Sequence, residues 1–168
     1  MNLSSPLLAL AACATLLGAA PLTCVAETTS LPPSFTDPAV EKAVLQANAE
    51  MIAAANRLDM DRFFSFIVDT DRGMIVQNGT IFRTRRNAYE AVKRGLRGVV
   101  KVDRRLDNPQ VTVISPESAI LVSDGSLAAV LEDGREMKSR FAVSLVWVRR
   151  DGRWMVLHGH YSMPAARP

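Results

Sequence analysis

Two histidines near the end of the chain are the side chains best suited to chemistry. His158 and His160 lie one residue apart in the segment VWVRRDGRWMVLHGHYSMP. On a strand, side chains at positions i and i+2 point to the same side. The pair could therefore bind a metal, act as a base with a helper, or pack at the end of a strand.

A metal site at this pair would need further ligands. Zinc sites use three or four protein ligands, and the chain contains no third histidine. Its two cysteines, Cys13 and Cys24, both lie in the N-terminal segment, and no carboxylates stand at a recognisable ligand spacing. We therefore expect neither a bound metal nor a cofactor.

Acid–base chemistry has three candidate residues. His160 carries an imidazole, which titrates near neutral pH, and Tyr161 follows it directly. On a regular strand these two side chains point to opposite faces, so only one can face a cavity unless a bulge intervenes. Asp124 and Asp103 are the candidate carboxylates in strand-like segments. His160 or Asp124 would act as the base, with Tyr89 or Tyr161 as a hydrogen-bond donor. None of these residues sits in a recognisable catalytic motif, so both binding and catalysis stay open.

The N-terminal segment has the composition of an export signal. Residues 1–26 contain no Lys, Arg, Asp or Glu and end in the cleavage-like sequence Cys24–Ala26. We predict a signal peptide over residues 1–26 and an exported protein, periplasmic or extracellular. The lipobox-like Leu10–Cys13 offers lipoprotein processing instead, but cleavage there would leave an apolar stretch behind the lipid. The apolar run is short for a membrane span, so no stable span is expected after cleavage.

The remaining chain has the composition of one globular domain. It belongs to a sequence of 168 residues that is 48% hydrophobic and 22% charged. Nine of its Lys and Arg residues fall within residues 83–105. Because no aromatic stacking platform accompanies them, we interpret them as solvated side chains and expect no nucleic-acid partner.

Local signals predict helices first and strands afterwards. After a flexible leader over residues 27–36, Asp37 caps a helix that begins at Pro38 and runs to Leu58. Asp59 caps a short aromatic-rich helix, Asn78-Gly79 forms a hairpin turn, and a helix from residue 85 ends at Gly98.

From Val99 onward the apolar residues alternate, which predicts an antiparallel meander of four strands. Pro109 and Pro116 are expected at strand ends, and a bulge is expected at Asp124-Gly125. Helices followed by strands indicate the α+β class, with the long helix lying across the sheet.

The order of these elements and the closing segment resemble the SnoaL-like branch of the nuclear transport factor 2-like superfamily. The ending is also similar to the association domain of calcium/calmodulin-dependent protein kinase II. A second similarity is NGTIFRTRRNAYEAV, a Gly-containing hairpin followed by a helix. The motif residues of the ending are Val146, Trp147, Arg149–Gly152, Trp154, His158, His160 and Ser162. The resemblance covers residues 39–164, within a domain placed at 37–164 and followed by a tail at 165–168.

This resemblance implies a conical barrel, in which a strongly curved antiparallel sheet packs against the long N-terminal helix and two shorter helices. It also implies a cavity and homodimers formed through the sheet face. The kinase domain has cavity arginines at positions that match Leu145 and Tyr161 here. A carboxylate-binding cavity of that kind is therefore not expected.

Our functional hypothesis is a domain that binds a small apolar molecule without established catalysis. The alternatives are an isomerase- or dehydratase-type enzyme with a His or Asp base, and an oligomerisation module. One fold hosts many activities, so the resemblance does not decide among them. The residues expected to line the pocket are Phe63, Phe66, Val76, Tyr89, Val122, Val143 and His160.

Overall fold

The computed structural model describes residues 35–72 and 74–164 of the chain. The predicted signal peptide, both cysteines, most of the leader and the tail lie outside these residues. In the described part, no helix is long and apolar enough to cross a membrane.

Within residues 35–72 and 74–164, three helices precede the meander, and each begins at a predicted or recognisable cap. They are α1 (Pro38–Asn56), α2 (Met60–Phe64) and α3 (Arg85–Gly95). The carboxylate of Asp37 accepts hydrogen bonds from the first backbone N–H groups of α1, and Asp59 does the same for α2. These side chains satisfy N–H groups that have no partner within the helix.

Both longer helices end earlier than predicted. After α1, Leu58 has a left-handed φ of 59°. The N–H groups of Leu58 and Asp59 donate hydrogen bonds to carbonyls of the last helical turn, and this pattern ends the helix. Helix α3 ends at Gly95, and Gly98 supplies a left-handed φ of 72° just before the next strand. Gly98 thus marks the turn after the helix, not its last residue.

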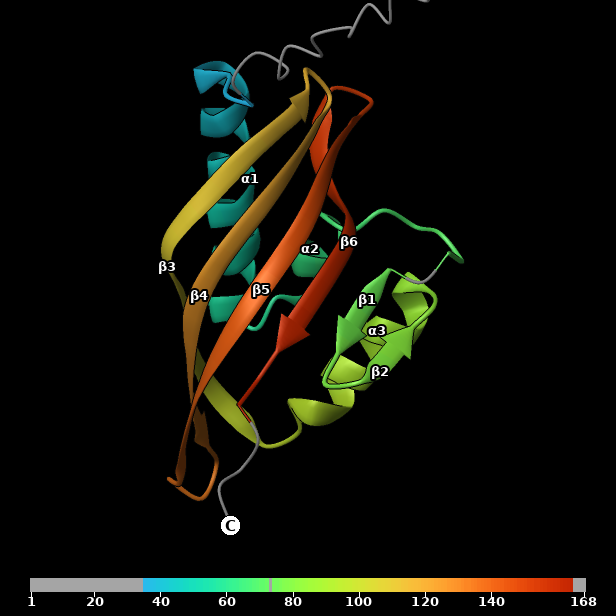
Figure 1. Ribbon diagram of the computed structural model, residues 1–168. Coiled ribbons are helices and arrows are strands. Elements are labelled where there is room, and N and C mark those ends of the chain that lie inside the picture. The colour runs from blue at the N-terminus through green and yellow to red at the C-terminus, as the bar shows by residue number, and fades with distance from the viewer. Residues whose placement is uncertain (1–34, 73, 165–168) are drawn as a thin grey trace, which may run out of the picture. The chain divides into compact units, whose positions relative to one another are not determined.

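Six strands form one curved sheet. In chain order they are β1 (Ile75–Gln77), β2 (Thr80–Phe82), β3 (Val99–Ser115), β4 (Ser118–Leu131), β5 (Glu136–Arg150) and β6 (Arg153–Ser162). The order across the sheet is β2-β1-β6-β5-β4-β3. The four-strand antiparallel meander is confirmed, but β1 lies parallel to β6 (Figure 1). The expectation of a wholly antiparallel sheet is therefore wrong at this pair, where a segment from before the meander adds to its last strand.

The predicted hairpin turn at Asn78-Gly79 is present, and Asp151-Gly152 forms a similar turn between β5 and β6. Asn78 and Gly79 have φ values of 48° and 78°, and Asp151 and Gly152 have 49° and 76°. Two successive positive φ values are the signature of a type I′ turn, which matches the twist of paired strands.

The bulge predicted in β4 lies instead in the neighbouring strand. Asp124 and Gly125 keep regular register with both neighbours, whereas β3 is irregular between Asp107 and Gln110. Pro109 therefore lies inside β3 rather than at a strand end, which is possible because a bulge leaves a residue outside the hydrogen-bonded ladder.

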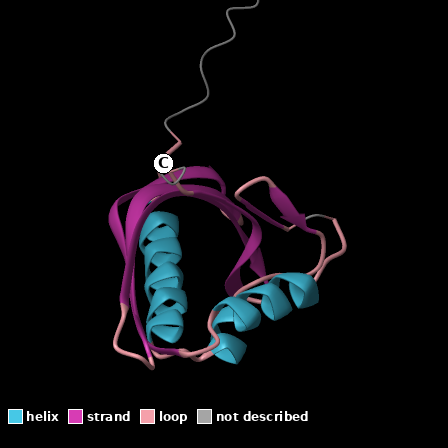
Figure 2. Cartoon of the chain, turned by 90° about the horizontal axis from the view of Figure 1, so that it is seen from below, coloured by secondary structure: helices cyan, strands magenta, loops and turns pink. Residues whose placement is uncertain are grey.

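The sheet bends around α1 without closing into a barrel (Figure 2). The core fills the space between them, and its most deeply buried large side chains are Trp147, Met74, Leu121, Leu145, Val44 and Val156. Burying a side chain of this size contributes about 1.5–3 kcal/mol. Trp147 is thus a packing residue, as the alternation on its strand predicts.

Candidate functional site

A bulge in β6 decides which side chains of the closing motif face inward. Val146 pairs with His158, but the next residue of β5, Trp147, pairs with Val156, so Leu157 is the extra residue. Val156 is buried before the bulge, and Gly159 is buried after it. A regular strand would have put Val156 and His160 on one face. The shift instead turns Tyr161 toward the interior, whereas His160 is exposed.

The interior of the curved sheet contains a cavity with an inner and an outer part. The inner part has a volume of about 70 Å³ and the outer part about 490 Å³. Both are lined mainly by apolar side chains. The two parts adjoin, because they share the lining residues Phe63, Gln77, Phe82, Val92, Arg104, Leu127 and Met163.

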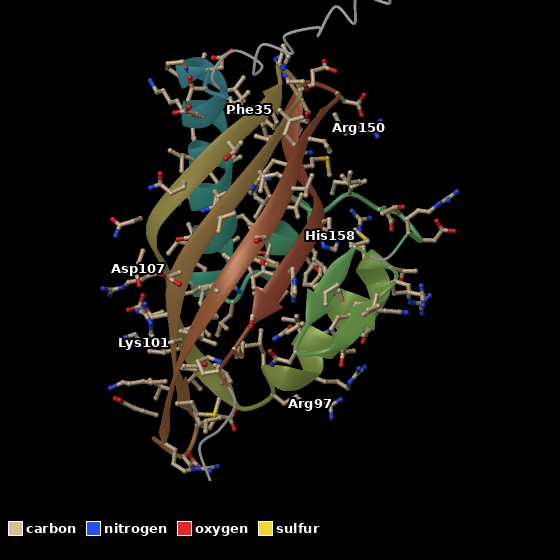
Figure 3. The ribbon with its side chains drawn as sticks, in the orientation of Figure 1. Phe35, Arg97, Lys101, Asp107, Arg150 and His158 are labelled. Carbon is tan, nitrogen blue, oxygen red and sulfur yellow. The ribbon has the colours of Figure 1, made fainter. Side chains whose placement is uncertain are left out.

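The outer part opens where α3 ends, β3 begins and β5 begins. Leu96, Val99 and Met137 line it there, and Met137 is 51% exposed. Figure 3 shows Arg97 at this lower end of the molecule and Arg150 at the opposite end. The opening therefore lies at the end of the sheet that is away from the β5–β6 turn.

Among the residues that the structure describes, Arg104 is the charged side chain of the cavity wall. The guanidinium carbon of Arg104 lies 4.7 Å from the ring centroid of Phe141 and 4.9 Å from that of Tyr161. Among residues 35–72 and 74–164, no carboxylate lies within ion-pair distance of Arg104. Its neighbour Arg105 differs, because it is exposed and bonds Asp103 at 2.6 Å.

The last residue of α1 holds the backbone at this arginine. The N–H of Arg104 donates to Asn56 Oδ1 at 2.7 Å, and Asn56 Nδ2 donates to the Arg104 carbonyl at 3.0 Å. Strand β3 is an edge strand, so these backbone groups have no neighbouring strand on that side. The amide of Asn56 replaces that strand and fixes the position of Arg104 relative to α1.

Only one of the residues predicted to line the pocket lies in the cavity wall. Phe63 lines both parts. Phe66 and Val143 are buried in the core at 4% and 2% exposure and do not contribute to the lining. Val122 is 49% exposed on the opposite face of the sheet.

Val76 and Tyr89 also lie outside the cavity wall. Val76 is on β1 beside His160, and its strand neighbours Ile75 and Gln77 provide the lining instead. Tyr89 packs edge-on against Phe64, with ring centroids 5.3 Å apart.

Tyr89 lines a separate surface groove together with Asp59 and Lys93. It donates a hydrogen bond of 2.9 Å to Asp61. This bond raises the pKa of Tyr89 above its ordinary value, because the carboxylate favours the protonated phenol.

The candidate bases and Tyr161 are not brought together. Asp124 and His160 are exposed, and neither lines the cavity. The hydrogen bond from Arg105 lowers the pKa of Asp103, which lies outside the cavity wall. In the described residues, no carboxylate or imidazole lines the cavity, and no three His, Cys, Asp or Glu side chains gather as metal ligands.

The sequence reasoning missed most of the polar lining, above all Gln77 and Arg104. Arg104 was assigned to a solvated basic stretch. A signal was present, because Val102, Arg104 and Leu106 alternate along β3 and so share a face. That pattern put one arginine among inward-facing apolar residues.

Solved structures share this fold at low sequence identity. A nuclear transport factor 2-like superfamily protein from Salmonella enterica serovar Typhimurium LT2 aligns with a TM-score of 0.67 and 18% identity, over 77% of this chain and 94% of that one. A protein with a cystatin-like fold from Caulobacter vibrioides aligns with a TM-score of 0.62 and 24% identity, over 76% and 91%.

A third structure is hexachlorocyclohexane dehydrochlorinase LinA-type3 from Novosphingobium barchaimii LL02. It aligns with a TM-score of 0.63 and 15% identity, over 76% of this chain and 88% of that one. No curated protein matches the sequence. The family model of the SnoaL-like domain matches residues 44–166. The chain therefore belongs to the SnoaL-like domain family and has the nuclear transport factor 2-like fold.

Proposed function

We propose that this domain binds a small, mainly apolar molecule in the cavity of its curved sheet. The observation that carries the proposal is the apolar cavity itself, whose outer part of about 490 Å³ leads to an inner part of about 70 Å³. Small-molecule sites typically have volumes of about 300–1,000 Å³, apolar walls and a few polar groups. Here Gln77, Arg104 and Tyr161 are the polar groups of the inner part.

Binding without catalysis fits the lining better than an enzyme does. General acid–base catalysis requires a titratable group within hydrogen-bond reach of the substrate. The described cavity wall has no carboxylate or imidazole, and the candidate bases His160 and Asp124 are exposed outside it. The dehydrochlorinase that shares the fold is an enzyme by name, but at 15% identity its reaction does not transfer to this chain.

The proposal also includes the location of the protein and its oligomeric state. Residues 1–26 support export to the periplasm or the outside of the cell, because they lack charge and end in small residues. Apolar side chains on the outer face of the sheet support a homodimer, and these are Ile114, Ile120, Val122, Val146 and Val148.

A neutral probe tests the binding proposal. NMR titration of the protein with 4-phenylbutan-1-ol is expected to show saturable shifts of the lining residues. Leu127→Trp should abolish them, because Leu127 lines both parts of the cavity and the larger ring fills the space. Val122→Trp, on the outer face, is the matched control and should bind as the unaltered protein does. Absence of saturable binding, or equal binding by Leu127→Trp, would contradict the proposal.

A further inference from the structure

We propose that Arg104 forms an acid-recognition subsite, and that the ligand of this domain is a monocarboxylate with an apolar body. The proposal rests on the ligand-binding function proposed above and names the class of ligand. Its starting observation is a guanidinium in an apolar cavity wall with no ion-pair partner among the described residues.

Arg104 is partly buried, and a charged group in such surroundings needs compensation, because leaving water is costly for a cation. The rings of Phe141 and Tyr161 supply part of it, since their faces attract the guanidinium at 4.7 and 4.9 Å. An aromatic ring does not satisfy N–H donors as an oxygen does, and a guanidinium has five of them. Arg104 therefore retains donors for an anion that enters the cavity.

The shape of the cavity selects among anions. The inner part, at about 70 Å³, has room for a compact group such as a carboxylate, and the larger apolar outer part has room for the rest of the ligand. A carboxylate is planar and accepts two parallel hydrogen bonds from one guanidinium. A phosphate ester carries more charge than this single cation can neutralise. The geometry therefore favours a carboxylate in the inner part and an apolar chain or ring toward the opening.

The position of Arg104 is set before any ligand binds. Asn56 holds both the N–H and the carbonyl of its backbone, at 2.7 and 3.0 Å. Gly125 leaves room for the ring of Phe141, which a side chain at that position would strike. A subsite held in place in this way loses little freedom on binding, which raises affinity.

A matched pair of probes tests the subsite. 4-Phenylbutyrate and 4-phenylbutan-1-ol share the same apolar body and differ in the acid group. At neutral pH the acid should bind the full protein at least about tenfold more tightly than the alcohol. In Arg104→Met this preference should disappear, while the affinity for the alcohol changes by less than about threefold.

Arg105→Met is the control. Arg105 is adjacent in sequence and carries the same charge, but it is exposed and paired with Asp103. Its loss should leave the acid preference unchanged. If the net charge of the protein caused the preference, both variants would weaken it alike, and the assignment to Arg104 would be wrong.

The outcomes separate this proposal from the binding function. Equal affinity of the unaltered protein for acid and alcohol, or a preference that survives Arg104→Met, overturns the acid subsite and leaves the cavity as a binding site. Binding of neither probe overturns both. Tighter binding of 4-phenylbutyl phosphate overturns the carboxylate assignment. Should Arg104→Met fail to fold, Arg104→Lys retains the charge without the planar fork, and unchanged acid affinity there would contradict bidentate recognition.

Discussion

The wall beside Arg104 depends on a position without a side chain. Gly125 of β4 lies opposite Phe141 of β5, and a Cβ there would meet the Phe141 ring and come within 2.7 Å of the Arg105 carbonyl oxygen. The Arg105 carbonyl is part of the backbone of β3, and the Phe141 ring is buried in the packed core, so neither has free space into which it can move. The close approach, rather than backbone conformation, requires glycine here.

Gly125→Ala is therefore expected to lower the free energy of unfolding by about 1–3 kcal/mol, the usual cost of overpacking. Chemical denaturation measures the change. Gly95→Ala is the control, since Gly95 is exposed on α3 with nothing within 4 Å of an added Cβ. There the free energy of unfolding should rise by about 0.5–1 kcal/mol. An unchanged free energy of unfolding in Gly125→Ala would show that the Phe141 ring can move aside.

Tyr89 gives a pH-dependent prediction at the same scale. Its hydrogen bond to Asp61 raises its pKa above the ordinary value of about 10. The protonated phenol is thus stabilised in the folded state, and this contribution is present below pH 10 and lost as the pH rises through the folded-state pKa.

Tyrosinate absorbance measures this pKa in a Tyr161→Phe background, where Tyr89 is the one remaining tyrosine. Asp61→Asn should shift the titration back toward the ordinary value. Asp71→Asn is the control, because Asp71 pairs with the exposed Arg72, and it should leave the titration of Tyr89 unchanged. An unchanged titration in Asp61→Asn would mean that the bond does not persist in solution.

At the scale of elements, α1 and the edge strand β3 are joined through one amide. Asn56 contacts backbone groups of Arg104 rather than its side chain. Asn56→Ala should lower the free energy of unfolding by about 1–3 kcal/mol, because two backbone groups lose their partner. It should also weaken acid binding more than alcohol binding, since the position of Arg104 is released.

Denaturation and the paired probe titrations measure both effects. The control is Asn87→Ala, at an exposed position of α3, which should change stability by no more than about 0.5 kcal/mol. Lost stability with an unchanged acid preference would make Asn56 a structural residue that does not position Arg104.

At the scale of the whole molecule, the outer face of the sheet predicts self-association. Ile114 and Val122 are 52% and 49% exposed there, beside half-buried Ile120 and Val146. Contiguous apolar surface of this kind often marks an interface. Sedimentation of the protein should give the mass of a dimer.

Val122→Lys should then produce monomers, because a charge on this face is costly to bury. Ile81→Lys is the control, at a residue 54% exposed on β2, the opposite edge strand of the sheet. A dimer that persists in Val122→Lys would place the interface elsewhere, and a monomeric unaltered protein would remove the prediction altogether.

Elements with local signals could be predicted from the sequence. Asp37 and Pro38 begin α1, and Asn78-Gly79 forms its turn, because caps and tight turns depend on a few adjacent residues. Alternating apolar residues determined the meander, since regular strands repeat every two residues. The resemblance in the closing motif likewise placed the chain in the correct family.

The residues that line the site, in contrast, could not be predicted from local patterns. The bulge at Leu157 reverses the alternation, so Tyr161 rather than His160 turns inward, and no local signal distinguishes that strand from a regular one. The basic stretch was interpreted as solvated, yet Arg104 lines the cavity and Arg105 stays outside, because neighbours on a strand point to opposite faces of the sheet. Which side of a strand faces a cavity depends on register and curvature, and both are properties of strands that meet only after folding.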